Sequence, residues 1–143
     1  MANAAGERPR AHPRPLSPHL QIWRWSVTMA SSIFHRVSGF GLALGTILLA
    51  AWLLALASGP DSYAIAQAIA AHPLGRLVLF GYTLAFVYHL LNGIRHLVWD
   101  VGHGFTPAVA TRSGVAVFAL TLIVTVAVWA AAYAMSGALE MPL

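Results

Sequence analysis

The sequence predicts an all-α membrane protein with three transmembrane helices. Hydrophobic residues make up 59% of the 143-residue chain and charged residues only 8%, and the mean hydropathy is +0.72. A water-soluble domain with a polar surface does not show this balance. A bilayer core of roughly 30 Å requires about 20 residues for each spanning helix, so three spans fit and leave no room for a large soluble domain.

The ionisable residues and the lack of cysteine exclude several classes of function. All eight basic residues are arginines, and the formal net charge is +4. Most of the arginines lie outside or at the ends of apolar runs, where they orient helices in a bilayer, so we expect no nucleic-acid binding. Without cysteine, this chain has no disulfide, no iron–sulfur ligand and no covalent haem attachment through a CxxCH motif. A metal would be held by histidine or carboxylate.

Residues 1–30 are predicted to form a cytoplasmic arm and an interfacial segment. Four prolines between residues 9 and 18 prevent a continuous helix. No apolar core follows closely enough for a cleaved secretory signal, so we expect an extended, uncleaved arm that is either a disordered leader or a docking element. The stretch RPLSPHLQIWRW could then lie along the membrane surface or a partner protein, with Trp23 and Trp25 as interfacial anchors.

Residues 31–143 are predicted to form the transmembrane anchor domain. The interval between Arg36 and Asp61 is almost wholly apolar or small, as a membrane helix requires. Two further apolar stretches follow, separated by a polar turn. The expected spans are about 31–57, 74–99 and 114–135.

Two features inside this domain are less specific. Gly41 and Gly45 form a GxxxG pair, which is a common small-residue packing face in membrane helices. The alanine-rich stretch YAIAQAIAAH between the first two spans could form a short interfacial helix. His72 at its end is expected to be an exposed loop histidine.

The distribution of arginine predicts the orientation in the membrane. The N-terminal arm, Arg95 and Arg112 belong to one side, whereas the opposite side has only Arg76 at a helix edge. By the positive-inside rule, the N-terminus and the second loop are cytoplasmic and the C-terminus is periplasmic.

Ionisable residues within the spans point to function, because they are costly there. Ser32, His35 and Arg36 have i, i+3, i+4 spacing and therefore project from one side of the first span. His89 and His96 lie in the half of the second span that faces the same side of the membrane. Since the first two spans are antiparallel, the two clusters can face each other at similar depth.

A single straight helix supplies at most one axial ligand to a haem iron. His89 and His96 are seven residues apart, about 10 Å along one face, so both side chains point the same way. His89 is the better candidate because it lies deeper and because Gly93, one turn on, leaves a side-chain-free gap for a flat macrocycle. His96, nearer the interface, suits a propionate or water contact.

Each of these residues also has a simpler interpretation. His89 and His96 could merely hydrogen-bond a neighbouring helix. We expect Arg95 to extend to the lipid headgroups. Arg36 could do the same, although a buried guanidinium there could neutralise propionates or polarise a carbonyl. We expect Asp100 to end its helix at the interface, in preference to a proton-relay role.

Three stretches together resemble a known family, the cytochrome b556 subunit of succinate dehydrogenase. The matching motifs are RPLSPHLQIW in the arm, SSIFHRVSG in the first span and HLLNGIRHLVWD in the second. The arm motif resembles the alphaproteobacterial and mitochondrial branch, although Trp23 stands where relatives often have tyrosine. The resemblance implies that the three spans are part of a hetero-oligomeric helical bundle in the bacterial inner membrane.

The resemblance also implies roles for individual residues. His89 matches the axial ligand of the haem iron, and the second ligand would come from a sister anchor subunit. Ser32 and Arg36 match the quinone-site residues, while His35 together with Arg36 lies where haem propionates are contacted. His96 matches a histidine near the haem.

The partners and cofactors follow from the same resemblance. The chain would anchor a flavoprotein subunit and an iron–sulfur subunit, which carry the FAD and the iron–sulfur clusters. With a second small anchor subunit it would hold haem b and contribute to ubiquinone reduction, with no succinate-oxidising chemistry of its own. Two alternatives stay open: the anchor of a menaquinol-linked fumarate reductase, and a haem-free structural anchor.

Overall fold

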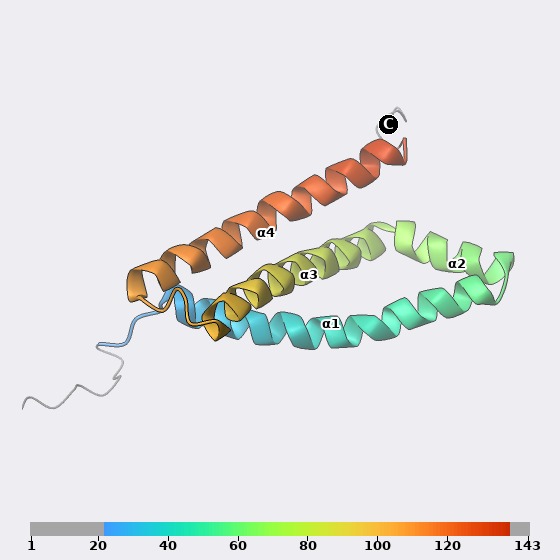
Figure 1. Ribbon diagram of the computed structural model, residues 1–143. Coiled ribbons are helices and arrows are strands. Elements are labelled where there is room, and N and C mark those ends of the chain that lie inside the picture. Colours follow the sequence, from blue (N-terminus) through green and yellow to red (C-terminus); the bar gives the residue numbers. More distant parts are fainter. Residues whose placement is uncertain (1–21, 138–143) are drawn as a thin grey trace, which may run out of the picture.

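The chain folds into three long helices and one short helix. The computed structural model describes residues 22–137, and no strand occurs among them. The predicted arm before residue 22 and the tail after residue 137 lie outside the described residues. The helices are α1 (Val27–Ala57), α2 (Pro60–Ala71), α3 (Pro73–Asp100) and α4 (Pro107–Met135) (Figure 1).

The long helices α1, α3 and α4 are each long and apolar enough to cross a membrane. This confirms the predicted all-α class with three candidate spans. The short helix α2 coincides with the alanine-rich stretch that was expected to be helical. At its start Gly59 has φ of 109°, a backbone conformation that residues with a side chain rarely adopt. Gly59 therefore allows the sharp change of direction between α1 and α2.

Local capping extends two of the long helices beyond the expected spans. α1 begins at Val27 because the Ser26 hydroxyl caps it by accepting a hydrogen bond from the Met29 amide at 3.1 Å. α4 begins at Pro107, whose fixed φ and missing N–H suit the first helical turn. The polar residues after Pro107 suggested a turn, but Thr111 and Ser113 donate their hydroxyls to carbonyls within the helix. They are therefore compatible with helix.

His72 caps α3 from the connection between α2 and α3. The residue is exposed, as expected, and its Nδ1 accepts a hydrogen bond from the Leu74 amide at 3.3 Å. Pro73 occupies the first position of the helix. At the other end, Asp100 is the last residue of α3 and is also exposed.

Helix α3 packs against both other long helices, and α1 also contacts α4 near its start. The buried positions between these helices are more often polar than apolar. Large hydrophobic side chains are instead exposed along the outer faces of α1, α3 and α4. This pattern is that of a membrane protein, because lipid solvates apolar side chains while polar groups must find partners inside the bundle. The buried polar residues are Ser31, Ser38, Asn92, Arg95, Thr121 and Thr125.

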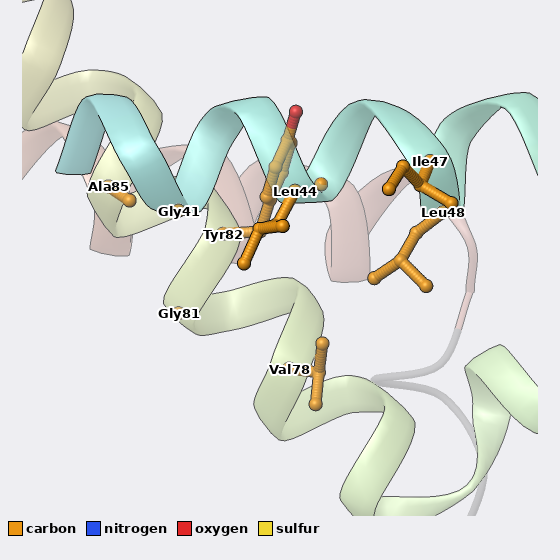
Figure 2. A pocket seen from close by; sticks show the side chains of 9 residues that line it. Gly41, Leu44, Ile47, Leu48, Val78, Gly81, Tyr82 and Ala85 are labelled. Atoms are coloured by element: carbon orange, nitrogen blue, oxygen red, sulfur yellow. The ribbon is translucent and has the colours of Figure 1, made fainter. Parts of the chain in front are cut away.

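The glycines of the GxxxG pair have different surroundings. Gly45 is buried against the Tyr82 ring, which would overlap any added Cβ, so this glycine lets α1 and α3 approach closely. Gly41 has no neighbour within 4 Å of such a Cβ. Both glycines line an open, mainly apolar groove of about 500 Å³ between α1 and α3, together with Gly81 and Ala85 (Figure 2).

Candidate functional site

Three histidines meet between α1 and α3. The imidazole rings of His35 and His89 stack with their centroids 4.0 Å apart and an angle of 8° between their planes. His96 lies on the other side of His35, at a centroid distance of 5.1 Å. The structure thus brings the two histidine-containing clusters together, as the antiparallel spans lead one to expect.

The Nδ1 atom of His89 is held by two oxygens of α1. It lies 3.2 Å from the His35 carbonyl oxygen and 3.1 Å from the Ser38 hydroxyl. The Ser38 hydroxyl donates its own hydrogen to the same carbonyl at 2.9 Å. Since the carbonyl can only accept, a hydrogen bond to it requires the ring hydrogen on Nδ1, which would leave the Nε2 lone pair for a ligand. This is the form of histidine that binds a metal, with its second nitrogen hydrogen-bonded to the protein.

Gly39 gives His89 the space it needs. A Cβ placed on Gly39 would lie 2.9 Å from His89 Cε1, closer than real Cβ contacts. Gly93, which was expected to leave a gap beside His89, faces His35 instead, with its hypothetical Cβ 4.0 Å from His35 Cε1. Two glycines, one on each helix, therefore flank the paired histidine rings.

His35 has an unsatisfied polar atom. Its Nδ1 is buried and has no hydrogen-bond partner among residues 22–137. Buried polar atoms are nearly always paired, so an unpaired one calls for an explanation. A polar group of a bound molecule, such as a propionate, is chemically suited to this position.

Ser32 and Arg36 lie on α1 beside His35. Ser32 is half-buried and Arg36 is exposed. Neither side chain makes a hydrogen bond to any other described residue. A hydroxyl and a guanidinium that are not committed to the bundle can donate to an oxygen-bearing ligand that approaches from the membrane.

No three histidine or carboxylate side chains in the described part of the chain are arranged to hold one metal ion. The three histidines are adjacent, but the stacked rings of His35 and His89 do not converge on a common point. The chemistry of His89, a histidine whose Nδ1 is hydrogen-bonded to the protein, suits one ligand to a haem iron.

Arg95 corrects one prediction. We expected its side chain to extend to the headgroups, and this is wrong: only 6% of the residue is exposed. The guanidinium points into the bundle, because four polar acceptors and an aromatic ring there replace its hydration. It donates hydrogen bonds to Ser113 Oγ at 2.9 Å, Ser31 Oγ at 3.0 Å, Asn92 Oδ1 at 3.2 Å and the Ala110 carbonyl at 2.9 Å.

Trp99 completes the surroundings of Arg95. The guanidinium carbon lies 4.1 Å from the centroid of the indole ring, which is a cation–π contact. The same ring also contacts His96, whose centroid is 5.1 Å away at an angle of 87°, and Phe105, whose centroid is 6.2 Å away. Trp99 therefore lies between the buried cation and the histidine cluster.

Sequence reasoning missed Ser31 and Asn92. Both are essentially inaccessible, at 1% and 0% exposure, and both bind Arg95. Tyr88 adds a hydrogen bond of 2.8 Å from its hydroxyl to the Ser31 carbonyl. The sequence does contain an arginine and small polar residues at matching depth on three apolar helices, which could have indicated these contacts. Hydrophobic periodicity alone, however, does not show which face of each helix points inward.

The sequence is similar to those of known membrane subunits. Residues 10–128 match the family described as succinate dehydrogenase/fumarate reductase transmembrane subunit. The succinate dehydrogenase cytochrome b560 subunit of Sus scrofa mitochondria is 41% identical over 117 residues, covering 79% of this chain and 68% of that protein. The cytochrome b556 subunit of Paracoccus denitrificans is 38% identical over 113 residues, covering 79% of this chain and 87% of that protein.

A third relative, the succinate dehydrogenase cytochrome b556 subunit of Rickettsia felis, is 34% identical over 116 residues, covering 81% of this chain and 90% of that protein. The family match includes all of α1, α2 and α3 and most of α4. It therefore contains the histidine cluster and the whole environment of Arg95. On this evidence the chain belongs to the succinate dehydrogenase/fumarate reductase transmembrane subunit family.

Proposed function

We propose that this chain is a membrane-anchor subunit of succinate dehydrogenase that binds haem b together with a sister anchor and contributes to ubiquinone reduction. The observation that carries the proposal is the arrangement of His89, whose Nδ1 lies against two oxygens of α1 while its Nε2 has no hydrogen-bond partner within residues 22–137. Relatives that are 38–41% identical to this chain are named succinate dehydrogenase cytochrome b556 and b560 subunits. The chain itself carries no succinate-oxidising chemistry.

His89 would be the axial ligand that this chain gives to the haem iron. The hydrogen bond to the His35 carbonyl orients the imidazole, which would strengthen iron binding. His35 and Arg36 would contact the propionates, and the unpaired Nδ1 of His35 supports this role. His96 would lie at the edge of the same site. When bound, the haem supplies a one-electron store near the quinone.

Ser32 and Arg36 would form this chain's part of the quinone site. The Ser32 hydroxyl can donate a hydrogen bond to a quinone carbonyl. The positive Arg36 guanidinium would stabilise negative charge on the reduced quinone instead of delivering protons. Protons would reach the site through water or through residues of partner subunits.

The partners would be a flavoprotein subunit, an iron–sulfur subunit and a second small anchor. The flavoprotein subunit would carry FAD. The iron–sulfur clusters would be on the iron–sulfur subunit, because this chain has no cysteine to hold them. The second iron ligand would come from the sister anchor. We place the chain in the bacterial inner membrane with a cytoplasmic N-terminus and a periplasmic C-terminus, on the basis of its arginine distribution.

A second candidate is the anchor of a fumarate reductase that uses menaquinol. The matching family includes both enzymes by its description. Ser32 and Arg36 would serve either quinone, so the choice depends on the activity of the purified complex. A haem-free structural anchor is the third alternative, in which His89 would only hydrogen-bond to α1.

The test is a reduced-minus-oxidised spectrum of the purified complex. We expect a b-type band in the wild type, its loss or severe change in H89A and its retention in H96A. A missing band in the wild type would leave the haem-free anchor, while loss in H96A with retention in H89A would reverse the ligand assignment. Succinate–ubiquinone and menaquinol–fumarate turnover of the same preparation then distinguish the two enzymes.

A further inference from the structure

The buried guanidinium of Arg95 has no role in the function proposed above. It lies between three helices, with donors directed to Ser31 on α1, Asn92 on α3, and Ala110 and Ser113 on α4. All four acceptors are neutral. A charge that is removed from water requires such partners, because its burial is otherwise very costly. If the three helix segments around Arg95 separated, the charge would be exposed or would lose its hydrogen-bond partners.

Arg95 contacts α1 at Ser31, the residue directly before Ser32. Arg95 Nη1 donates to the Ser31 hydroxyl at 3.0 Å, and the Tyr88 hydroxyl donates to the Ser31 carbonyl at 2.8 Å. Both the side chain and the backbone of Ser31 are thus bound from α3. The rotation and depth of α1 at this point determine where Ser32 and His35 lie.

A second line of contacts leads from Arg95 to the histidines. The guanidinium packs on Trp99, Trp99 contacts His96, and His96 contacts His35. Arg95 touches none of the residues to which we assign a ligand or a quinone. Its effect on them would pass through Ser31 and through Trp99.

We propose that Arg95 is a positioning residue that binds the start of α1 to α3 and α4 and thereby sets the placement of Ser32 and His35 in the quinone and haem site. This inference rests on the proposed function for its catalytic consequence. Its structural part concerns only contacts within this chain. The two parts can be tested separately.

The structural part is tested with an engineered disulfide, which is possible because the chain has no cysteine of its own. A Cβ on Gly114 would lie 2.9 Å from Val27 Cγ1, so cysteines at these two positions are close enough to join α4 to α1. In the purified complex we expect V27C/G114C to cross-link readily under mild oxidation. Adding R95Q should slow the cross-link at least severalfold, whereas the matched control R112Q, at an exposed arginine of α4, should not.

The catalytic part is tested by the kinetics of R95Q, R95K and S31A. Since a misplacement of 1 Å can reduce a rate by about 100-fold, we expect R95Q to lower kcat/KM for ubiquinone by at least about tenfold, with unchanged reduction of an artificial acceptor by the soluble subunits. R95K should lower kcat/KM about as much, because the compact lysine ammonium lacks the planar five-donor fork that reaches four acceptors on three helices. S31A should lower kcat/KM for ubiquinone by a smaller factor. The double variant R95Q/S31A should have about the same kcat/KM as R95Q, since both substitutions remove the hydrogen bond between Arg95 and Ser31.

The possible failures are distinguishable. An unchanged cross-linking rate in R95Q, full activity of R95K, or additive losses in R95Q/S31A would each overturn the positioning role. A wild-type complex without a b-type band or quinone turnover would overturn the proposed function while leaving the cross-linking test valid. If R95Q does not assemble, S31A and R95K carry the test, because each retains part of the network.

Discussion

The His89 imidazole is parallel to that of His35 and is hydrogen-bonded to the backbone carbonyl of the same residue. The ring centroids are 4.0 Å apart, and His89 Nδ1 lies 3.2 Å from the His35 oxygen. The histidine that we propose as the haem ligand on α3 is thus oriented by α1. If the proposal is right, changes on α1 should alter the haem site although α1 contributes no proposed iron ligand.

Gly39 provides the most direct test of this dependence. In G39A the new Cβ would lie 2.9 Å from His89 Cε1, so the imidazole has to shift. We expect a lower haem content per flavin and a changed b-type spectrum in the purified complex. G41A is the matched control, because a Cβ at Gly41 meets nothing within 4 Å on the same helix. Equal spectra for G39A and the wild type would contradict the proposed location of the ligand.

Ser38 tests the hydrogen bond behind His89. S38A removes the hydroxyl that lies 3.1 Å from Nδ1 but leaves the His35 carbonyl in place. Loss of a group that hydrogen-bonds the second nitrogen of a metal-binding histidine typically weakens metal binding about 10-fold to 100-fold. We expect the lower part of that range because the His35 carbonyl remains. Haem retention during purification is the measurement. S58A, which loses a comparable hydroxyl-to-carbonyl bond at an exposed site, should retain haem as the wild type does.

Ser32 and Arg36 should affect quinone turnover selectively. S32A removes one hydrogen-bond donor to the quinone, and R36Q removes the positive charge that would stabilise its reduced form. A bond to a charged group contributes about 1.5–3 kcal/mol, so R36Q is expected to cost about 10-fold to 150-fold in kcat/KM for ubiquinone. Turnover with an artificial acceptor should stay unchanged in both variants. Equal loss of the two activities would indicate failed assembly instead.

Gly45 should govern the packing of α1 on α3. In G45A the new Cβ overlaps the Tyr82 ring, so the helices must separate or the ring must move. Overpacking of this kind costs about 1–3 kcal/mol, and we expect a lower dissociation temperature for the complex in detergent. G81A lines the same groove with nothing within 4 Å and should behave as the wild type does (Figure 2). Unchanged stability of G45A would show that the helices reposition without cost.

Thr125 should tolerate the loss of its hydroxyl. The residue is fully buried, and its Oγ1 has no hydrogen-bond partner among the described residues. T125V keeps the shape and removes an unsatisfied polar atom, so the stability of the complex should be equal or slightly higher. T121V is the comparison, since Thr121 donates to the Val117 carbonyl at 2.7 Å and should lose stability. A large loss in T125V would reveal a polar partner supplied by another subunit.

The sequence by itself was sufficient for the class of the protein, and it supplied the histidines, Ser32 and Arg36 that the proposed function uses. Apolar length and the near absence of charge require spanning helices, because unpaired backbone groups cannot be left in lipid. The antiparallel order of the first two spans placed His35 opposite His89. Seven-residue spacing limited the ligands from α3 to one.

Only the tertiary structure decided which polar residues face inward. Ser31 and Ser32 are neighbours with the same chemistry, yet Ser31 is 1% exposed against α3 and Ser32 is half-buried beside His35. Arg95 was expected at the headgroups but is bound by three helices. The physical reason is that apolar residues cover every face of these helices, since lipid and protein solvate them equally well. Hydrophobic periodicity is then weak, and the rotation of each helix follows from hydrogen bonds between distant residues.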